Sequence, residues 1–256
     1  MLEINKIHQG DCLELMKEIF DESVDLVLTD PPYNIARKNN FHTMGRKGID
    51  FGEWDKGFDL FSYIDEVVRV LNKNGSFIVF NAWKNLGDIV KYAESKGLVT
   101  KDMIRLEKSN PMPRNRDRRY ITDFECAIWF TMPKAKWCFN RQNPKYERPK
   151  FIGCIEKGLH PTQKNLDLMK WLIKIHSNVG MIILDPFIGS GTTALACKEL
   201  ERNFIGIELD KKYFEIAKKR VEEHSQQSTL LPLEENSKED GIPPTNKLVG
   251  ILSKRL

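Results

Sequence analysis

The chain has 256 residues, of which 41% are hydrophobic and 30% are charged, and this composition is typical of a globular protein rather than a disordered or fibrous one. Its 40 basic and 36 acidic residues give a formal net charge of +4, which is too small an excess to indicate a polyanionic partner by itself. No apolar run approaches the roughly 18 residues of a membrane span. The N-terminal sequence also lacks the pattern of a signal peptide, so we expect a cytoplasmic protein without a membrane partner.

Four apolar runs alternate with amphipathic stretches along the chain, and turn residues bound both kinds of segment. The runs predict buried parallel strands at residues 24–30, 76–81, 181–186 and 203–209. The amphipathic stretches predict helices at residues 11–20, 60–71, 84–96, 162–176, 192–200 and 211–224. This alternation is typical of a doubly wound, Rossmann-like α/β sheet, in which ligands bind at the carboxyl ends of the strands.

Three segments depart from the alternation. Residues 36–58 lack periodicity and predict a long loop, and loops of this length in compact domains are usually functional. Residues 101–120 carry seven basic and three acidic residues, an excess equal to that of the whole chain. The segment after residue 226 is polar and proline-rich and predicts a mobile tail over 227–256.

The basic run within residues 101–120 is a candidate nucleic-acid interface. Guanidinium groups can contact phosphates or bind guanine edges through two hydrogen bonds. A solvated charged loop is the alternative interpretation. The candidate residues are Arg114, Arg116, Arg118 and Arg119.

The cysteines argue against both a disulfide framework and a zinc site. They are odd in number, scattered, and never arranged as C-x-x-C. We therefore expect free thiols and no metal ion at Cys12, Cys126, Cys138, Cys154 and Cys197.

The first group of residues that indicates chemistry is Asp30-Pro31-Pro32-Tyr33, directly after the strand predicted at 24–30. Two prolines remove backbone donors and leave carbonyl oxygens free to accept hydrogen bonds from a ligand. The Asp30 carboxylate and the Pro31 carbonyl can each accept one N–H of an exocyclic amine, while the Tyr33 ring can stack on a base. An ordinary strand-ending turn is the alternative interpretation of this motif taken alone.

The second group is LDPFIGSGTT, residues 184–193. A strand, an acid and a Gly-x-Gly turn that opens a helix allow the backbone to approach a nucleotide-like ligand, with Ser190, Thr192 and Thr193 facing it. The segment is not a P-loop because no lysine follows the second glycine, and it is not a complete G-x-G-x-x-G. A plain strand-to-helix turn is again the alternative. Glu208 ends the next predicted strand at a spacing that suits an acid binding the ribose hydroxyls of an adenosine-containing cofactor, although a surface capping acid has the same pattern.

Together these segments resemble the β class of S-adenosylmethionine-dependent DNA amino-methyltransferases, whose motif order is circularly permuted. Residues 30–33 are similar to the family's catalytic tetrapeptide and residues 185–193 to its methionine-binding loop, and the catalytic motif comes first, as in that class. HPTQK at residues 160–164 is similar to the motif that precedes the cofactor loop. Residues 8–16 are similar to the N-terminal motif that contacts the cofactor's adenine. The resemblance covers about residues 4–224.

The resemblance implies a site-specific enzyme that transfers a methyl group from S-adenosylmethionine to the N6 amine of a flipped adenine in double-stranded DNA. The catalytic residues it implies are Asp30, Pro31, Pro32 and Tyr33. The cofactor-binding residues it implies are Asp11, Cys12, Asp30, His160, Thr162, Lys164, Asp185, Phe187, Gly189, Ser190, Gly191, Thr192 and Glu208. Trp54 and Asp55, in the loop after the catalytic motif, are candidates to close over the base, and a packing tryptophan is the alternative.

The same resemblance divides the chain into four parts. Residues 1–100, with the loop 36–58, form the catalytic half of the methyltransferase domain, and residues 160–226 form the cofactor-binding half. Residues 101–159 form an inserted target-recognition region, and 227–256 form the tail. Residues 48–56 and 110–120 look like adenine methyltransferases of restriction–modification systems, so a homodimer and a cognate restriction endonuclease are further partners that the resemblance allows.

Several other functions remain open from the sequence. Methylation of cytosine N4 needs the same amine chemistry, and aspartate rather than serine at position 30 favours adenine only by family association. An RNA or protein methyltransferase of the same fold and a DNA-binding module without catalysis are further alternatives. Zinc-dependent deamination is disfavoured because the H-x-E and P-C-x-x-C pattern is absent.

Overall fold

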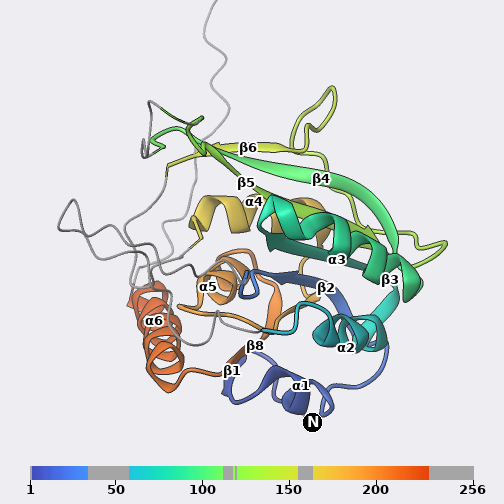
Figure 1. Cartoon of the computed structure of the whole chain (residues 1–256). Coiled ribbons are helices and arrows are strands. Elements are labelled where there is room, and N and C mark those ends of the chain that lie inside the picture. Colours follow the sequence, from blue (N-terminus) through green and yellow to red (C-terminus); the bar gives the residue numbers. More distant parts are fainter. Residues whose placement is uncertain (1, 34–57, 112–117, 119, 155–163, 231–256) are drawn as a thin grey trace, which may run out of the picture.

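The computed structural model describes residues 2–33, 58–111, 118, 120–154 and 164–230, which form a sheet with helices packed on both faces (Figure 1). Its strands are β1 (Lys6–Gln9), β2 (Val24–Thr29), β3 (Leu71–Asn81), β4 (Val99–Lys108), β5 (Phe124–Thr131), β6 (Lys150–Gly153), β7 (Ile182–Asp185) and β8 (Asn203–Glu208). Its helices are α1 (Cys12–Met16), α2 (Ser62–Val70), α3 (Trp83–Ser95), α4 (Leu166–His176), α5 (Thr192–Glu199) and α6 (Lys211–Leu230). None of the helices in the described part of the chain is long and apolar enough to cross a membrane.

The eight strands lie in the order β1-β8-β7-β2-β3-β5-β4-β6, from the bottom to the top of Figure 1. Neighbouring strands from β1 to β3 are parallel, which confirms the doubly wound α/β prediction for the four strands expected from the sequence. β5 is antiparallel to both β3 and β4, and β6 pairs parallel with β4. The sheet is therefore mixed, with its antiparallel part confined to one edge.

Alternate side chains of the central strands enter two different cores. Leu26 and Leu28 of β2 pack in the cluster that contains α4 and α5, whereas Val27 packs in the cluster that contains α1, α2 and α3. Because both faces are covered, these strands are continuous apolar runs in the sequence. That is why β2, β3, β7 and β8 were recognisable from composition alone.

The strands β1, β4, β5 and β6 were not predicted. β1 and β6 have four residues each, and β4 is charged and buries only one of its ten residues, so none of the three shows a continuous apolar run. β5 carries a fully buried run from Cys126 to Thr131, which is a signal that the sequence did contain.

Three helices differ in their bounds from the prediction by four residues or more. α4 begins at Leu166 rather than at residue 162, because the Asn165 side chain caps it by accepting from the Leu168 amide at 3.0 Å. α1 ends at Met16 rather than at residue 20 because the Arg69 guanidinium of α2 donates to the carbonyls of Met16 at 2.7 Å and Ile19 at 2.9 Å, which satisfies the end of a short helix. α6 continues to Leu230, since no glycine or proline interrupts it before Pro232. Residues 227–230 of the predicted tail are therefore helical, and residues 231–256 lie outside the described part of the chain.

The described part of the predicted target-recognition region, residues 101–159, supplies strands to the sheet. Its strands β4, β5 and β6 continue the sheet beyond β3, and its role in target recognition stays a prediction. The strands continue the sheet because β5 pairs with β3 over six register positions from Ser76 to Asn81, and this pairing buries its apolar run. The connections around these strands remain the segments to which a recognition role can be assigned.

A buried carboxylate fixes the place where the two halves of the sheet meet. Asp185, at the end of β7 and 4% exposed, accepts hydrogen bonds from Thr29 Oγ1 at 2.8 Å, Thr193 Oγ1 at 2.5 Å and the Phe187 amide at 3.2 Å. These contacts join the ends of β2 and β7 to the first turn of α5. Burial raises the pKa of Asp185 to about 6, although its hydroxyl donors oppose the shift.

This pKa predicts a measurable loss of stability as pH rises. An acid whose folded-state pKa lies above its unfolded value destabilises the folded state as pH rises between the two. Between pH 3.8, the ordinary pKa of an aspartate, and about pH 6, the free energy of unfolding should fall by roughly 3 kcal/mol on account of Asp185. Urea unfolding of the wild type and Asp185→Asn at a series of pH values measures this as the difference between the two curves.

The exposed Asp88 of α3 supplies a matched control, and Asp88→Asn should keep the wild-type pH profile. If the free energies of unfolding of the wild type and Asp185→Asn differed by the same amount from pH 4 to pH 7, the raised pKa of Asp185 would be contradicted.

Candidate active site

The two motifs singled out in the sequence meet at the carboxyl ends of β2 and β7. These strands are neighbours, with Leu26 beside Ile183 and Val27 beside Leu184. On one side of this pair β2 is followed by β3, and on the other side β7 is followed by β8, so the order of the strands in the chain reverses direction between β2 and β7. Such a reversal is the place where open α/β sheets bind ligands. Asp30 follows β2 and Asp185 ends β7, so the fold brings the predicted catalytic and cofactor motifs together.

The Asp30-Pro31-Pro32-Tyr33 segment is held by side-chain contacts at both ends. The Tyr33 hydroxyl donates to Asp30 Oδ1, and the Tyr33 carbonyl accepts from Asn85 Nδ2 at 2.8 Å. Asn85 also donates to Asn81 Oδ1 at 2.8 Å, which ties the segment to the end of β3. The sequence expected the Tyr33 ring to stack on a base, and the structure adds that its hydroxyl orients the Asp30 carboxylate.

Lys164 binds the catalytic segment. Its ammonium lies 2.9 Å from Asp30 Oδ2 and 2.8 Å from Glu125 Oε2, and it donates to the Tyr33 hydroxyl at 3.2 Å. The same nitrogen lies 5.0 Å from the centre of the Phe80 ring. The sequence placed Lys164 among the cofactor ligands, whereas the polar partners that the structure gives it belong to the catalytic segment and β5.

The charges around Lys164 form an alternating series that the sequence analysis missed. Glu125 of β5 also pairs with Lys108 at the end of β4, at 2.8 Å. The Lys164 charge is the largest cause that lowers the pKa of Glu125 to about 2. Burial opposes the charge on Lys164, but Asp30 and Glu125 outweigh it and raise the pKa of Lys164 well above its usual value. Burial raises the pKa of Asp30, with Lys164 and Tyr33 opposing the shift.

The glycine turn after β7 adopts a conformation that favours glycine. Gly189 has φ +54° and Gly191 has φ +84°, both in the left-handed region. A Cβ on Gly191 would lie 3.1 Å from Ala217 Cβ, which explains the close packing of α5 on α6. A Cβ on Gly189 would meet nothing within 4 Å, so open space adjoins this turn.

Glu208 supports this turn from β8. Its Oε2 accepts from the Gly189 amide at 2.8 Å and its Oε1 from the Asp210 amide at 2.9 Å, while burial raises its pKa to about 7. β1 pairs with β8, and Gly10 donates its amide to the Glu208 carbonyl at 3.0 Å, so the segment that precedes Asp11 reaches the same corner.

Several predicted cofactor residues have partners within the protein. Asp11 caps α1 by accepting from the Leu13 amide at 2.8 Å, and burial raises the pKa of the Cys12 thiol to about 12, which makes it a poor nucleophile. Ser190 is buried and its hydroxyl accepts from Arg220 at 3.0 Å. Phe187 packs edge-on against Tyr63 at 5.2 Å. Thr192 is buried in the first turn of α5.

The remaining predicted residues lie mostly outside the described part of the chain. These are His160, Thr162, Arg114, Arg116, Arg119, Trp54 and Asp55, and no geometry is assigned to them. Arg118 is described and exposed. No group of three or more side chains suited to a metal ion was found among the described residues.

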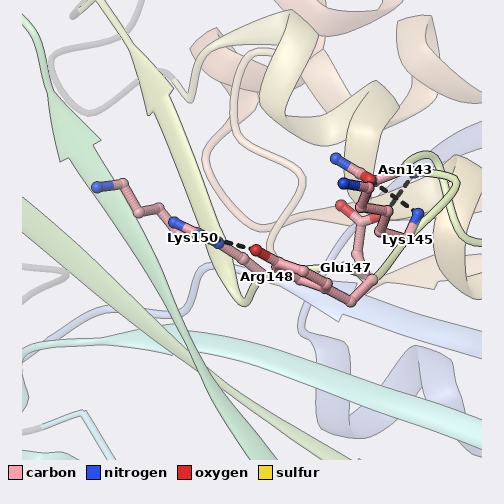
Figure 2. Close-up of a pocket in the computed structure, with 6 residues that line it drawn as sticks. Asn143, Lys145, Glu147, Arg148 and Lys150 are labelled. Atoms are coloured by element: carbon pink, nitrogen blue, oxygen red, sulfur yellow. Dashed lines mark hydrogen bonds between the residues drawn. The ribbon is translucent and has the colours of Figure 1, made fainter.

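A pocket elsewhere in the molecule does not coincide with the predicted site (Figure 2). It is lined by Asn143, Lys145, Tyr146, Glu147, Arg148 and Lys150, in the segment that leads into β6. Arg148 donates to the Tyr146 hydroxyl at 3.0 Å, and Glu147 accepts from the Asn143 amide at 3.1 Å. The segment precedes the amino end of β6, whereas Asp30 and Asp185 lie at the carboxyl ends of β2 and β7.

Comparisons with known proteins agree with this geometry. The family model of the N6/N4 DNA methylases matches residues 24–219. The Type II methyltransferase M.HinfI of Haemophilus influenzae is 31% identical over 86% of this chain and 69% of its own length. The Type II methyltransferase M2.MboI of Moraxella bovis is 31% identical over 85% of this chain and 87% of its own length.

Solved structures show the same fold. The complex of M1.HpyAVI with S-adenosylmethionine superimposes with a TM-score of 0.69 at 43% identity, covering 84% of this chain and 98% of the other. The cytosine-N4-specific PvuII DNA methyltransferase gives a TM-score of 0.66 at 17% identity, which supports the fold alone. The match over the catalytic segment, the glycine turn and the sheet between them shows that this chain belongs to the N6/N4 DNA methylase family and is a DNA methyltransferase.

Proposed function

We propose that the protein methylates the exocyclic N6 amine of an adenine that is flipped out of double-stranded DNA, as the modification enzyme of a Type II restriction–modification system. Its methyl donor is S-adenosylmethionine. The observation that carries the proposal is the Asp30 carboxylate, fixed by Tyr33 and Lys164 beside the glycine turn of β7. DNA is the substrate partner, and a cognate endonuclease, a homodimer and a cytoplasmic location belong to the same proposal.

The chemistry required of the chain is the activation of a weak nucleophile. The amine lone pair of adenine is delocalised into the ring, and the base must leave the duplex before its amine can react. Asp30 and the Pro31 carbonyl accept the two N–H groups and favour a pyramidal nitrogen, while the Tyr33 ring stacks on the base. Bound S-adenosylmethionine supplies an electrophilic methyl group, whose C–S bond breaks as the N–C bond forms. The methylated nitrogen then loses a proton, and alignment and electrostatic placement supply the rate.

The residues proposed to hold the cofactor fit an adenosine-containing group. Open space adjoins Gly189, and the Glu208 carboxylate beside it can accept ribose hydroxyls with the lone pairs that its two backbone contacts leave. Asp11 and Cys12 lie on the connection from β1, the neighbour of β8. The others proposed to line this site are Phe187, Ser190, Gly191, Thr192, His160 and Thr162. Asp185 is proposed to hold this turn in place through its hydrogen bonds to the Phe187 amide and Thr193. Asp30 borders both ligands.

The DNA contacts are proposed from charge. Arg118 is exposed between β4 and β5, and guanidinium groups in that connection can neutralise phosphates. Arg114, Arg116 and Arg119 are proposed for the same role.

Methylation of cytosine N4 is the second candidate, because the amine chemistry is identical and the PvuII enzyme shares the fold. Transfer of labelled methyl groups to unmethylated DNA, followed by analysis of the nucleosides in the digest, separates the two. We expect N6-methyladenine. N4-methylcytosine would overturn the base assignment, and absence of label in DNA with label in RNA or protein would overturn the substrate.

Removal of the catalytic carboxylate should abolish transfer and affect cofactor binding much less. In Asp30→Ala the amine loses its charged acceptor, and we expect the single-turnover rate to fall by about 10³-fold or more. Calorimetry with S-adenosylhomocysteine should show a loss of affinity far smaller than the loss of rate, because Asp30 is one of many residues proposed around the cofactor. Asp102→Ala, at an exposed position of β4, is the matched control. A variant at position 30 that keeps the wild-type rate would refute the catalytic assignment.

The proposed ribose contact predicts a pH-dependent cofactor affinity. Burial places the pKa of Glu208 at about 7, so the carboxylate that accepts ribose hydroxyls is mostly protonated at pH 6 and ionised at pH 8. The affinity for S-adenosylhomocysteine should therefore rise about tenfold from pH 6 to pH 8. In Glu208→Gln this rise in affinity should disappear. Any pH dependence that remains in the variant then reports the titration of the ligand's own amino group. Identical pH profiles for the two proteins would remove the ribose role.

A further inference from the structure

Both oxygens of the Asp30 carboxylate are already occupied by groups of this chain. Oδ1 accepts from the Tyr33 hydroxyl, and Oδ2 lies 2.9 Å from the Lys164 ammonium. An ammonium and an exocyclic amine present the same kind of N–H donor to a carboxylate. Each oxygen keeps a further lone pair, but Lys164 is a cation and a reacting amine becomes positively charged, so the two compete for the single negative charge of Asp30.

The nearly buried position of Lys164 restricts how its ammonium can move away from Asp30. Its side chain is 11% exposed, and its three N–H donors match three acceptors: Asp30, Glu125 and the Tyr33 hydroxyl. A buried cation that loses one anion needs another to remain paired. Glu125, at 2.8 Å, is that second anion.

Glu125 is itself fixed. Its Oε1 lies 2.8 Å from Lys108 Nζ, so one oxygen is anchored to β4 while the other faces Lys164. Positive charge develops on the amine nitrogen during methyl transfer, and an unpaired ammonium close to it would oppose the reaction. An anchored carboxylate that keeps Lys164 paired removes this opposition.

We infer that Glu125, anchored by Lys108, is a positioning residue that holds Lys164 when the target amine displaces it from Asp30. The inference rests on the proposed amine methylation, whichever base carries the amine. Glu125 contacts neither the reacting nitrogen nor the methyl donor and acts through Lys164.

A double-mutant cycle tests the inference. Steady-state and single-turnover methyl transfer are measured for the wild type, Glu125→Gln, Lys164→Met and the double variant. We expect Glu125→Gln to lower kcat by about 10- to 100-fold with little change in KM for DNA. The same substitution should have less than about a threefold effect in the Lys164→Met background, because the residue it acts through is absent. Glu125→Asp should restore part of the lost rate.

Glu107→Gln is the matched control for the loss of an ion pair. Glu107 lies on β4, its side chain is 31% exposed against 32% for Glu125, and it pairs with Lys150 at 2.6 Å. It should keep the wild-type kcat. A wild-type kcat in Glu125→Gln, an equal loss in both backgrounds, or a loss confined to KM and thermal stability would each overturn the inference. The rates are measured on whichever base the wild type methylates, so a cytosine target would correct the proposed function and leave this test intact.

Discussion

The structure depends on a single meeting point, where the carboxyl ends of β2 and β7 are joined through the buried Asp185. Its oxygens bind Thr29 of β2 and Thr193 of α5, and the catalytic segment begins at the next residue of β2. A parallel sheet with helices on both faces can expose functional groups only where its strands end. The proposed chemistry therefore belongs to this edge, where the contacts of Asp185 hold the ends of β2 and β7 and the start of α5 together.

Beside the Asp30–Tyr33 segment the protein places a series of partly buried charges. Lys108, Glu125, Lys164 and Asp30 alternate in sign along a line of ion pairs between 2.8 and 2.9 Å. A buried ion pair is a poor source of stability because desolvation offsets most of the attraction. In the proposed methylation these pairs orient the Asp30 carboxylate and preset the electrostatic environment of an amine that acquires positive charge. Burial raises the pKa of Asp30 and of Tyr33, whereas the Lys164 charge lowers the pKa of Glu125 to about 2.

The extent of successful prediction follows from burial. β2, β3, β7 and β8 are covered on both faces and are apolar throughout, and the sequence was sufficient to locate them. β4 carries several exposed charged residues, and β6 is a short strand at the edge of the sheet. Neither has a strong apolar pattern of its own, and β4 pairs with β5 while β6 pairs with β4. The sequence therefore did not reveal that strands of the predicted recognition region continue the sheet. The connections that surround these strands keep the proposed DNA-binding role.

The sequence by itself determined where the two motifs lie and the backbone conformation that they favour, because the Asp-Pro-Pro-Tyr segment and the Gly-x-Gly turn are local patterns whose requirements hold within a few residues. Only the tertiary structure decided which motifs share a site and which partners the charged groups choose. Lys164 was assigned to the cofactor from its place in the chain, whereas strand register brings Glu125 and Asp30 to its ammonium. Electrostatic pairing depends on distance in space, and a chain without its fold contains no information on distances between residues so far apart in sequence.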